Sequence, residues 1–222
     1  MLLQEMTYPV GTRVLLWRLE EEAPRLLALC RERGIPVGDI VDLPVKRLRE
    51  TAAERLLLCQ AFGHPVALLH DGQGAPSVEG VDVNISISHT TVLVALAWNE
   101  QAVIGLDAER MDRQQVIRVR GKFLNAAEQQ LINPDDQVAH VMAWTAKEAI
   151  IKAERNSAID WTEGICLDEF IPSDGETLFT ARCGDRRYHL VARVVEGHII
   201  TLAMPVTASC TVSRQVTIPP NA

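Results

Sequence analysis

The sequence has a shortage of basic and of aromatic residues, and both shortages exclude functions. Its 22 lysines and arginines stand against 29 acidic residues, which gives a formal charge of −7, and aromatic residues make up only 5%. Proteins that bind nucleic acids generally need basic surfaces that neutralise phosphates. We therefore expect no nucleic-acid partner.

Paired cysteines and long apolar runs are missing as well. The five cysteines (Cys30, Cys59, Cys166, Cys183 and Cys210) include no Cys-x-x-Cys pair, so we expect neither a disulfide framework nor a zinc site. No run approaches the roughly 18 apolar residues of a membrane helix, and the first residues do not resemble a signal peptide. These absences favour a cytoplasmic protein without a membrane partner, and we expect a monomer.

What is present is a 47% hydrophobic sequence with clear periodicity, enough for a substantial core. The pattern predicts helices over 20–33, 43–62, 126–132 and 137–155, and strands over 14–17, 83–89, 188–195 and 198–204. Runs 92–98 and 102–106 are expected to form a β-hairpin. Asn125 and Glu128 match a capping box. The tail around Pro219 and Pro220 is expected to be loose.

The first motif is Gly105-Leu106-Asp107-Ala108-Glu109. In a strand, Gly105, Asp107 and Glu109 share one face, and two carboxylates on one face require a cation or solvent. The glycine would leave room for a ligand. The ordinary alternative is a solvated acidic strand end.

The second motif, Trp144-Thr-Ala-Lys-Glu-Ala-Ile-Ile-Lys152, lies in the predicted helix 137–155. Trp144, Glu148 and Lys152 fall on one stripe, where Glu148 and Lys152 could be an ordinary exposed pair. Their apolar surroundings argue for partnered charges instead. Together the two motifs offer three carboxylates, the hard oxygen ligands that Mg²⁺ prefers.

The third motif, Ser86-Ile-Ser-His-Thr90, places hydroxyls and an imidazole at a strand end. These groups can donate hydrogen bonds to phosphate oxygens. A polar turn that caps its own backbone is the alternative interpretation.

The three motifs, in this order, resemble the 4′-phosphopantetheinyl transferases of the surfactin-synthetase-activating type. That family has Gly-(Ile/Val)-Asp-x-Glu followed about forty residues later by Trp-(Ser/Thr/Cys)-x-Lys-Glu-(Ala/Ser)-x-x-Lys, and this sequence differs from it only by Leu106. Residues 123–128 also resemble the family's Phe-x-(Ser/Thr)-x-x-Glu segment. The resemblance extends from about residue 45 to 152.

The resemblance implies roles for particular residues. Asp107, Glu109 and Glu148 correspond to the magnesium ligands, and Glu148 and Lys152 to catalytic residues. The implied coenzyme A contacts are Arg47, Arg55, Ser88, His89, Lys147 and Lys152. One departure concerns the family's Gly-Lys-Pro segment, which reads Gly74-Ala75-Pro76 here and lacks the lysine.

The implied fold is an α/β (α+β) architecture of two pseudo-symmetric halves. Each half has a small antiparallel sheet with packed helices, and the active site lies in the cleft between them. We place the boundary so that residues 1–103 carry coenzyme A contacts and residues 104–222 carry the metal-binding and catalytic motifs.

The implied reaction is Mg²⁺-dependent transfer of phosphopantetheine from coenzyme A to a serine of an apo acyl or peptidyl carrier protein, with release of 3′,5′-ADP. Two alternatives are another magnesium-dependent phosphotransfer or hydrolysis enzyme, and a non-catalytic relative that binds a carrier protein or nucleotide. Carrier proteins are typically acidic, and a basic stretch could dock one: Arg110, Arg113, Arg118, Arg120 and Lys122. A solvated basic surface is the other interpretation.

Overall fold

The computed structural model describes residues 1–8 and 11–206, so Cys210 and the predicted loose tail lie outside the described residues. The helices are α1 (Ala23–Glu32), α2 (Val45–Phe62), α3 (Gln115–Arg118), α4 (Ala126–Leu131) and α5 (Gln137–Glu154), with a 3-10 turn η2 (Arg120–Lys122). The strands are β1 (Leu2–Thr7), β2 (Arg13–Arg18), β3 (Leu68–His70), β4 (Pro76–Val78), β5 (Asn84–His89), β6 (Leu93–Asn99), β7 (Gly105–Arg110), β8 (Ile165–Leu167), β9 (Glu176–Cys183), β10 (Arg186–Val195) and β11 (His198–Pro205).

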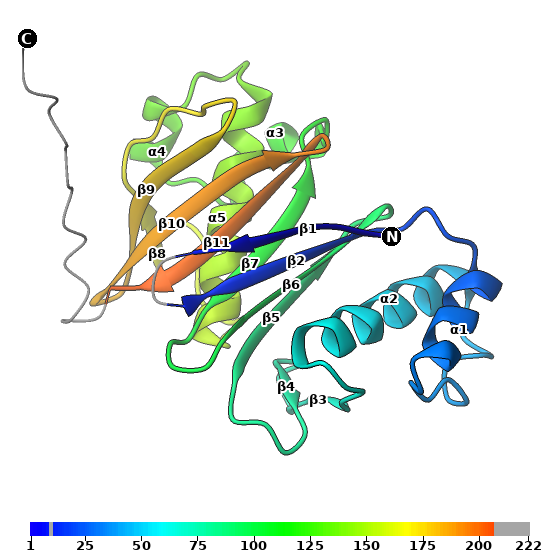
Figure 1. The fold of residues 1–222 in the computed structure, drawn as a ribbon. Coiled ribbons are helices and arrows are strands. Elements are labelled where there is room, and N and C mark those ends of the chain that lie inside the picture. Colours follow the sequence, from blue (N-terminus) through cyan, green and yellow to red (C-terminus); the bar gives the residue numbers. More distant parts are fainter. Residues whose placement is uncertain (9–10, 207–222) are drawn as a thin grey trace, which may run out of the picture.

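The strands form antiparallel sheets, which confirms the mixed α/β class (Figure 1). One sheet has four strands in the order β1-β2-β6-β5, and another has five in the order β7-β11-β10-β9-β8. A small pair, β3-β4, accompanies them. The pseudo-two-fold relation between the halves and the boundary at residue 103 stay predictions.

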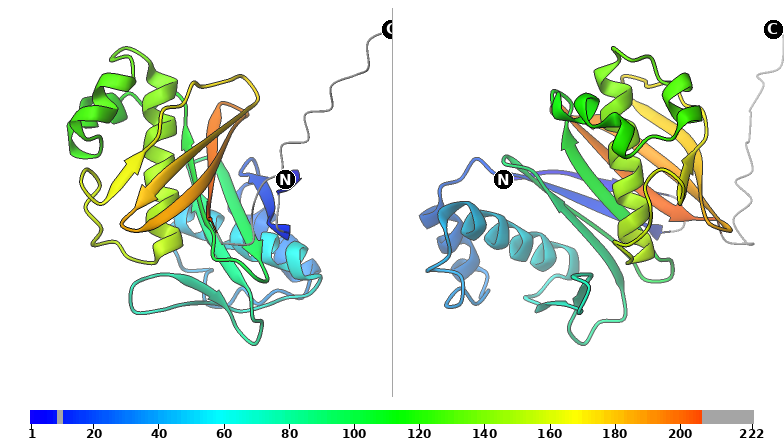
Figure 2. Two further views of the ribbon diagram at one scale, coloured as in Figure 1. Left: turned by 90° about the vertical axis from the view of Figure 1, so that its left-hand side faces the viewer. Right: turned by 180° about the vertical axis from the view of Figure 1, so that it is seen from behind.

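Strand alternation gives each sheet two apolar faces. In β2, Val14 and Leu16 join a core shared with Leu106 and Leu202 of the second sheet, whereas Leu15 points into the core under α1 and α2. Successive side chains of a strand lie on opposite faces, so one apolar run can serve both cores. The two sheets therefore pack against each other, and helices cover their outer faces (Figures 1 and 2).

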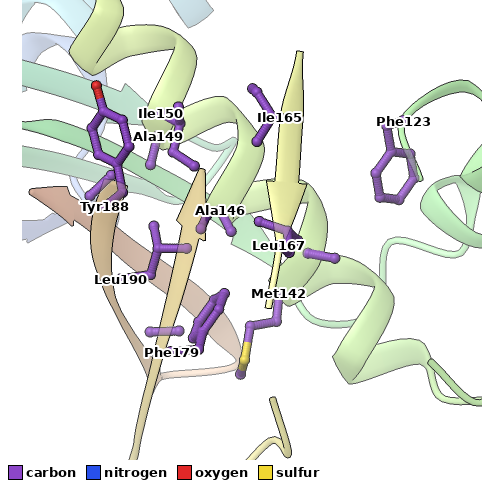
Figure 3. Close-up of a cluster of buried hydrophobic side chains, with 14 of the residues drawn as sticks. Phe123, Met142, Ala146, Ala149, Ile150, Ile165, Leu167, Phe179, Tyr188 and Leu190 are labelled. Atoms are coloured by element: carbon purple, nitrogen blue, oxygen red, sulfur yellow. The ribbon is translucent and has the colours of Figure 1, made fainter. Parts of the chain in front are cut away.

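Helix α5 packs on the outer face of the five-stranded sheet. Its buried residues Met142, Ala146 and Ile150 face β8, β9 and β10, where Phe179 and Leu190 complete the cluster (Figure 3). The helix begins at the side chain of Asp136, which accepts the Ala139 N–H. Its predicted range is confirmed. None of the helices in the described ranges has the length and apolar character required to cross a bilayer.

The predicted capping box is confirmed, whereas the predicted hairpin is wrong. Asn125 and Glu128 bond each other's backbone at the start of α4. Strand β6 pairs with β2 and β5, while β7 pairs with β11. The short connection between β6 and β7 therefore crosses from one sheet to the other.

Candidate active site

Gly105 brings the strand of the first motif against the helix of the second. A Cβ at this position would lie 1.8 Å from the Ala149 carbonyl oxygen and 2.7 Å from the Ala153 nitrogen, both in α5. Any larger residue would force β7 and α5 apart. The prediction that Gly105 leaves room for a ligand is therefore wrong, because the helix backbone fills that space.

Asp107 is buried on this same face and is held by two donors. Its Oδ1 accepts hydrogen bonds from the Lys152 ammonium and the Ser88 hydroxyl, both at 2.8 Å. Lys152 also donates to the carbonyl oxygens of Leu106 at 3.0 Å and Ile87 at 3.3 Å. An ammonium has three hydrogens, so these oxygens occupy all of them.

Two serines of β5 join it to the free edge of β7. The Ser86 hydroxyl accepts the Leu106 N–H at 2.9 Å, and the Ser88 hydroxyl accepts the Ala108 N–H at 3.1 Å. The serine hydroxyls of β5 thus accept the β7 N–H groups that backbone carbonyls would accept in a continuous sheet. These bonds lie where the two sheets meet. Because Ser88 also donates to Asp107, a phosphate contact by Ser88 would compete with that bond.

Glu148 is half-buried on the α5 stripe that carries Lys152. Burial raises the pKa of its carboxyl, and the charge of Asp107 raises it further, while Lys152 and Arg113 lower it. Within residues 1–8 and 11–206, the Glu148 carboxylate makes no hydrogen bond or ion pair. A sheltered carboxylate with a raised pKa is typical of general acid–base groups.

Glu109 contacts the cation of Arg113. Its Oε2 forms an ion pair with the Arg113 guanidinium, and its Oε1 accepts the Arg110 backbone N–H at 2.9 Å. The guanidinium carbon of Arg113 also lies 5.6 Å from the centre of the Trp144 ring, a cation–π distance. Arg113 therefore belongs to the site, although the sequence pattern placed it in a docking surface.

The three carboxylates lie in one region but are not arranged as metal ligands. In the described part of the chain, no three His, Cys, Asp or Glu side chains form a group that could hold a metal ion. Lys152 pairs with Asp107 and Arg113 with Glu109 instead. The repulsion between Asp107 and Glu148 is one that a bound cation would relieve, and hard carboxylate oxygens fit Mg²⁺.

Lys147 is fully buried, which contradicts its predicted role as a phosphate contact. Its Nζ donates to the Glu128 carboxylate at 2.7 Å and to the carbonyl oxygens of Trp161 at 2.7 Å and Ile165 at 2.9 Å. Glu128 also accepts the Leu167 N–H at 2.7 Å. The Lys147 ammonium therefore ties α4, α5 and β8 together, with no hydrogen left for a substrate.

The remaining predicted coenzyme A contacts are brought together in part. His89 and Arg47 meet at Glu50, a buried carboxylate of α2: His89 Nδ1 lies 3.5 Å from Oε1, and Arg47 Nη1 lies 4.0 Å from Oε2. Arg55 instead forms a bidentate pair with Asp39. Arg55 thus fixes the loop before α2, while Arg47 and His89 form a basic pair beside it.

The basic stretch runs from the last residue of β7 through α3 to the end of η2. Arg110 pairs with Asp112, and Arg120 is partly covered and bonds a nearby carbonyl. Arg118 and Lys122 are exposed, so these two carry its accessible charge.

A cavity of about 210 Å³ opens beside Lys152. Its walls come from the loop 73–76, from residues 85–87 of β5 and from the end of α5, where Arg155 follows the last helical residue. Ala75, the departure from the family's lysine, lies on this wall. The sequence motifs gave no indication of Arg155.

Part of the chain matches the model of a known protein family. No curated protein is significantly similar to the chain. Residues 103–203 match the model of the 4′-phosphopantetheinyl transferase superfamily, a segment that contains Asp107, Glu109, Glu148 and Lys152. This segment of the chain is thus similar to a family whose chemistry is phosphopantetheinyl transfer.

Proposed function

We propose that the protein transfers the 4′-phosphopantetheine arm of coenzyme A to a serine of an apo acyl or peptidyl carrier protein. The observation that carries the proposal concerns Glu148, which lies within the segment that matches the family. Its carboxylate is half-buried, feels the charge of Asp107, and has no partner among the described residues. In this reaction the serine oxygen forms a bond to phosphorus, the diphosphate bond breaks, and 3′,5′-ADP leaves.

Glu148 is the proposed general base. Its pKa is raised by burial, which strengthens it as an acceptor for the serine proton. Lys152 is the proposed phosphate contact. Of its three acceptors the Ile87 carbonyl is the most distant at 3.3 Å, so that bond is the one we expect an incoming phosphate to replace.

Asp107, Glu109 and Glu148 are the residues that would hold Mg²⁺. The ion would supply positive charge that offsets the negative charge of the diphosphate. Two of these carboxylates also contact cations of the chain, Asp107 with Lys152 and Glu109 with Arg113.

The proposal is tested by incubating the protein with coenzyme A, Mg²⁺ and an apo carrier protein, and measuring the mass of the carrier. We expect a mass gain of one phosphopantetheine, and a loss of about 100-fold or more in rate for Glu148→Gln. Glu163→Gln, which alters an exposed glutamate away from the site, is the control. Full activity of Glu148→Gln would overturn the assigned role.

The other outcomes separate the alternatives. Breakdown of coenzyme A without a mass gain of the carrier would favour a different phosphotransfer or hydrolysis enzyme. Binding of coenzyme A or carrier protein without any chemistry would favour a non-catalytic relative.

We also propose that Arg118 and Lys122 form part of a dock for the acidic carrier. Both are exposed, and α3, which carries Arg118, packs against the helix α5 that carries Glu148. Opposite charge steers association. Arg118→Glu with Lys122→Glu should raise the KM for the carrier several-fold and leave the KM for coenzyme A unchanged. An unchanged carrier KM would contradict the dock.

A further inference from the structure

The cavity beside Lys152 has a basic lining. Among the described residues that line it, none is acidic, and two are cations, Lys152 and Arg155. At about 210 Å³ it is smaller than the roughly 300–1,000 Å³ of pockets that enclose a whole drug-sized ligand. Because Asp107 already pairs with Lys152, Arg155 supplies the uncompensated positive charge of this lining, which favours one anionic group.

Arg155 adopts a backbone conformation for which glycine is the ordinary choice. It follows the last residue of α5 with φ 52° and ψ 34°, in the left-handed region. Side chains are disfavoured there, and helices that end this way usually place glycine at this position. In the described ranges, Glu196 is the only other non-glycine residue with positive φ. The sequence therefore keeps a long cation at a position with a conformational cost.

The guanidinium of Arg155 has no partner among the described residues. The residue is exposed, and its side chain makes no hydrogen bond or ion pair with the part of the chain that the structure describes. The N–H groups of Ala75 and Gln73 lower the pKa of Asp71, and the charge of Arg155 lowers it as well. Asp71 Oδ1 accepts the Gln73 N–H at 2.8 Å and the Ala75 N–H at 2.9 Å, and Asp71 forms no ion pair with Arg155.

Ser86 adds a neutral donor to the same wall. It is buried, and its oxygen accepts the Leu106 N–H at 2.9 Å. A hydroxyl that accepts one bond keeps its own hydrogen to donate. The cavity thus combines two cations with a fixed hydroxyl.

We propose that this cavity binds a phosphoryl group of the substrate, with Arg155 as its principal charged contact. A guanidinium can bind phosphate oxygens through two parallel hydrogen bonds. The inference rests on the proposed function only for the identity of the substrate, because the preference for an anion follows from the lining. Coenzyme A offers two sources, its 3′-phosphate and its diphosphate.

The test uses one substitution of Arg155 that removes the charge and one that retains it. Arg155→Asn removes the charge with a residue that tolerates the left-handed region, and Arg155→Lys retains the charge. Arg33→Asn is the matched control, since Arg33 is an exposed arginine at the end of α1 and does not line the cavity. Calorimetry then gives Kd values for coenzyme A, dephospho-coenzyme A and inorganic pyrophosphate.

We expect Arg155→Asn to weaken coenzyme A binding roughly tenfold or more, which is typical for loss of a charge-assisted hydrogen bond. Arg155→Lys should recover part of the loss, and Arg33→Asn should change nothing. The melting temperature of Arg155→Asn should equal or exceed that of the unaltered protein. A loss confined to coenzyme A identifies the 3′-phosphate, whereas an equal loss for dephospho-coenzyme A identifies the diphosphate.

Unchanged Kd values for Arg155→Asn would overturn the inference. In that case a lower melting temperature would assign Arg155 to stabilisation of the helix dipole alone. If pyrophosphate binding depends on Arg155 but no carrier gains mass, the anion site stands and the proposed function fails.

Discussion

The two lysines of α5 lie five residues apart, and each ammonium contacts a carboxylate and two carbonyl oxygens. Lys147 makes its bonds to Glu128 and neighbouring carbonyls with no exposed side-chain surface, whereas the Lys152 side chain is 29% exposed and borders a cavity. The bonds are similar, but the surroundings differ. Exposure therefore separates a lysine that maintains the fold from one that can respond to a ligand.

The carboxylates that pair with these two lysines, Glu128 and Asp107, also differ in their surroundings. Glu128 is fully engaged, because it closes the capping box of α4, binds Lys147 and accepts the Leu167 N–H. Asp107 has Glu148 nearby, a carboxylate that has no partner among the described residues. One motif thus places a satisfied polar network and an incomplete one on two sides of a single helix, and an unpaired buried polar group is costly.

Removing Lys147 should have the largest effect on stability. Lys147→Met leaves the Glu128 carboxylate buried without its cation, which costs about 3–5 kcal/mol for a buried pair. Urea denaturation monitored by circular dichroism measures this loss. The double variant Lys147→Met with Glu128→Gln keeps the capping box and should recover part of it. A loss below about 1 kcal/mol for the single variant would contradict a fold-maintaining role.

The contact between α5 and β7 should be the next most sensitive. Gly105→Ala places a methyl group against the Ala149 carbonyl oxygen, and overpacking of this kind costs about 1–3 kcal/mol or more. Because α5 must move, coenzyme A binding should weaken as well. Gly121→Ala is the control, since a Cβ there meets no atom within 4 Å. Equal denaturation midpoints for the two variants would show that the helix and strand do not depend on this contact.

Removing Lys152 should cost less stability than removing Lys147. Asp107 keeps the Ser88 hydrogen bond in Lys152→Met, so we expect a loss of about 1.5 kcal/mol, typical of one charge-assisted bond. The rate of carrier modification should fall by a larger factor than this stability loss alone explains. Similar stability losses for Lys147→Met and Lys152→Met would remove the distinction between the two sides of α5.

Local patterns in the sequence predicted the local features of both regions. The capping box of Asn125 and Glu128 depends on residues three apart. Strand alternation places the side chains of Leu106 and Asp107 on opposite faces of β7. The range of α5 was predictable for the same reason. Each of these features depends on neighbours within one or two turns.

Features that depend on distant partners were not predictable. The motif Lys147-Glu148 does not show which side chain enters the core, because that is decided by where Glu128 packs. Similarly, the cost of a side chain at Gly105 comes from Ala149, forty-four positions later in the sequence. The pairing of Arg113 with Glu109 has four-residue spacing but joins the end of β7 to the segment after it, where helical periodicity gives no guide.

The smallest effect should be a gain in stability on the open side of α5. Burial and the charge of Asp107 raise the pKa of Glu148 above its ordinary value of 4.5. Between the ordinary pKa of the unfolded chain and the raised pKa of the folded protein, the folded protein holds more protons than the unfolded chain. The free energy of unfolding therefore falls as pH rises through this interval. Glu148→Gln cannot ionise and should therefore be slightly more stable than the unaltered protein at pH 7. The stabilities of the variant and the unaltered protein should converge at acidic pH, below the ordinary glutamate pKa.

Thermal melting in magnesium-free buffer at several pH values measures this difference. A variant that is less stable at pH 7 would mean that Glu148 supports the fold as Lys147 does, and the contrast between the two sides of the helix would be lost.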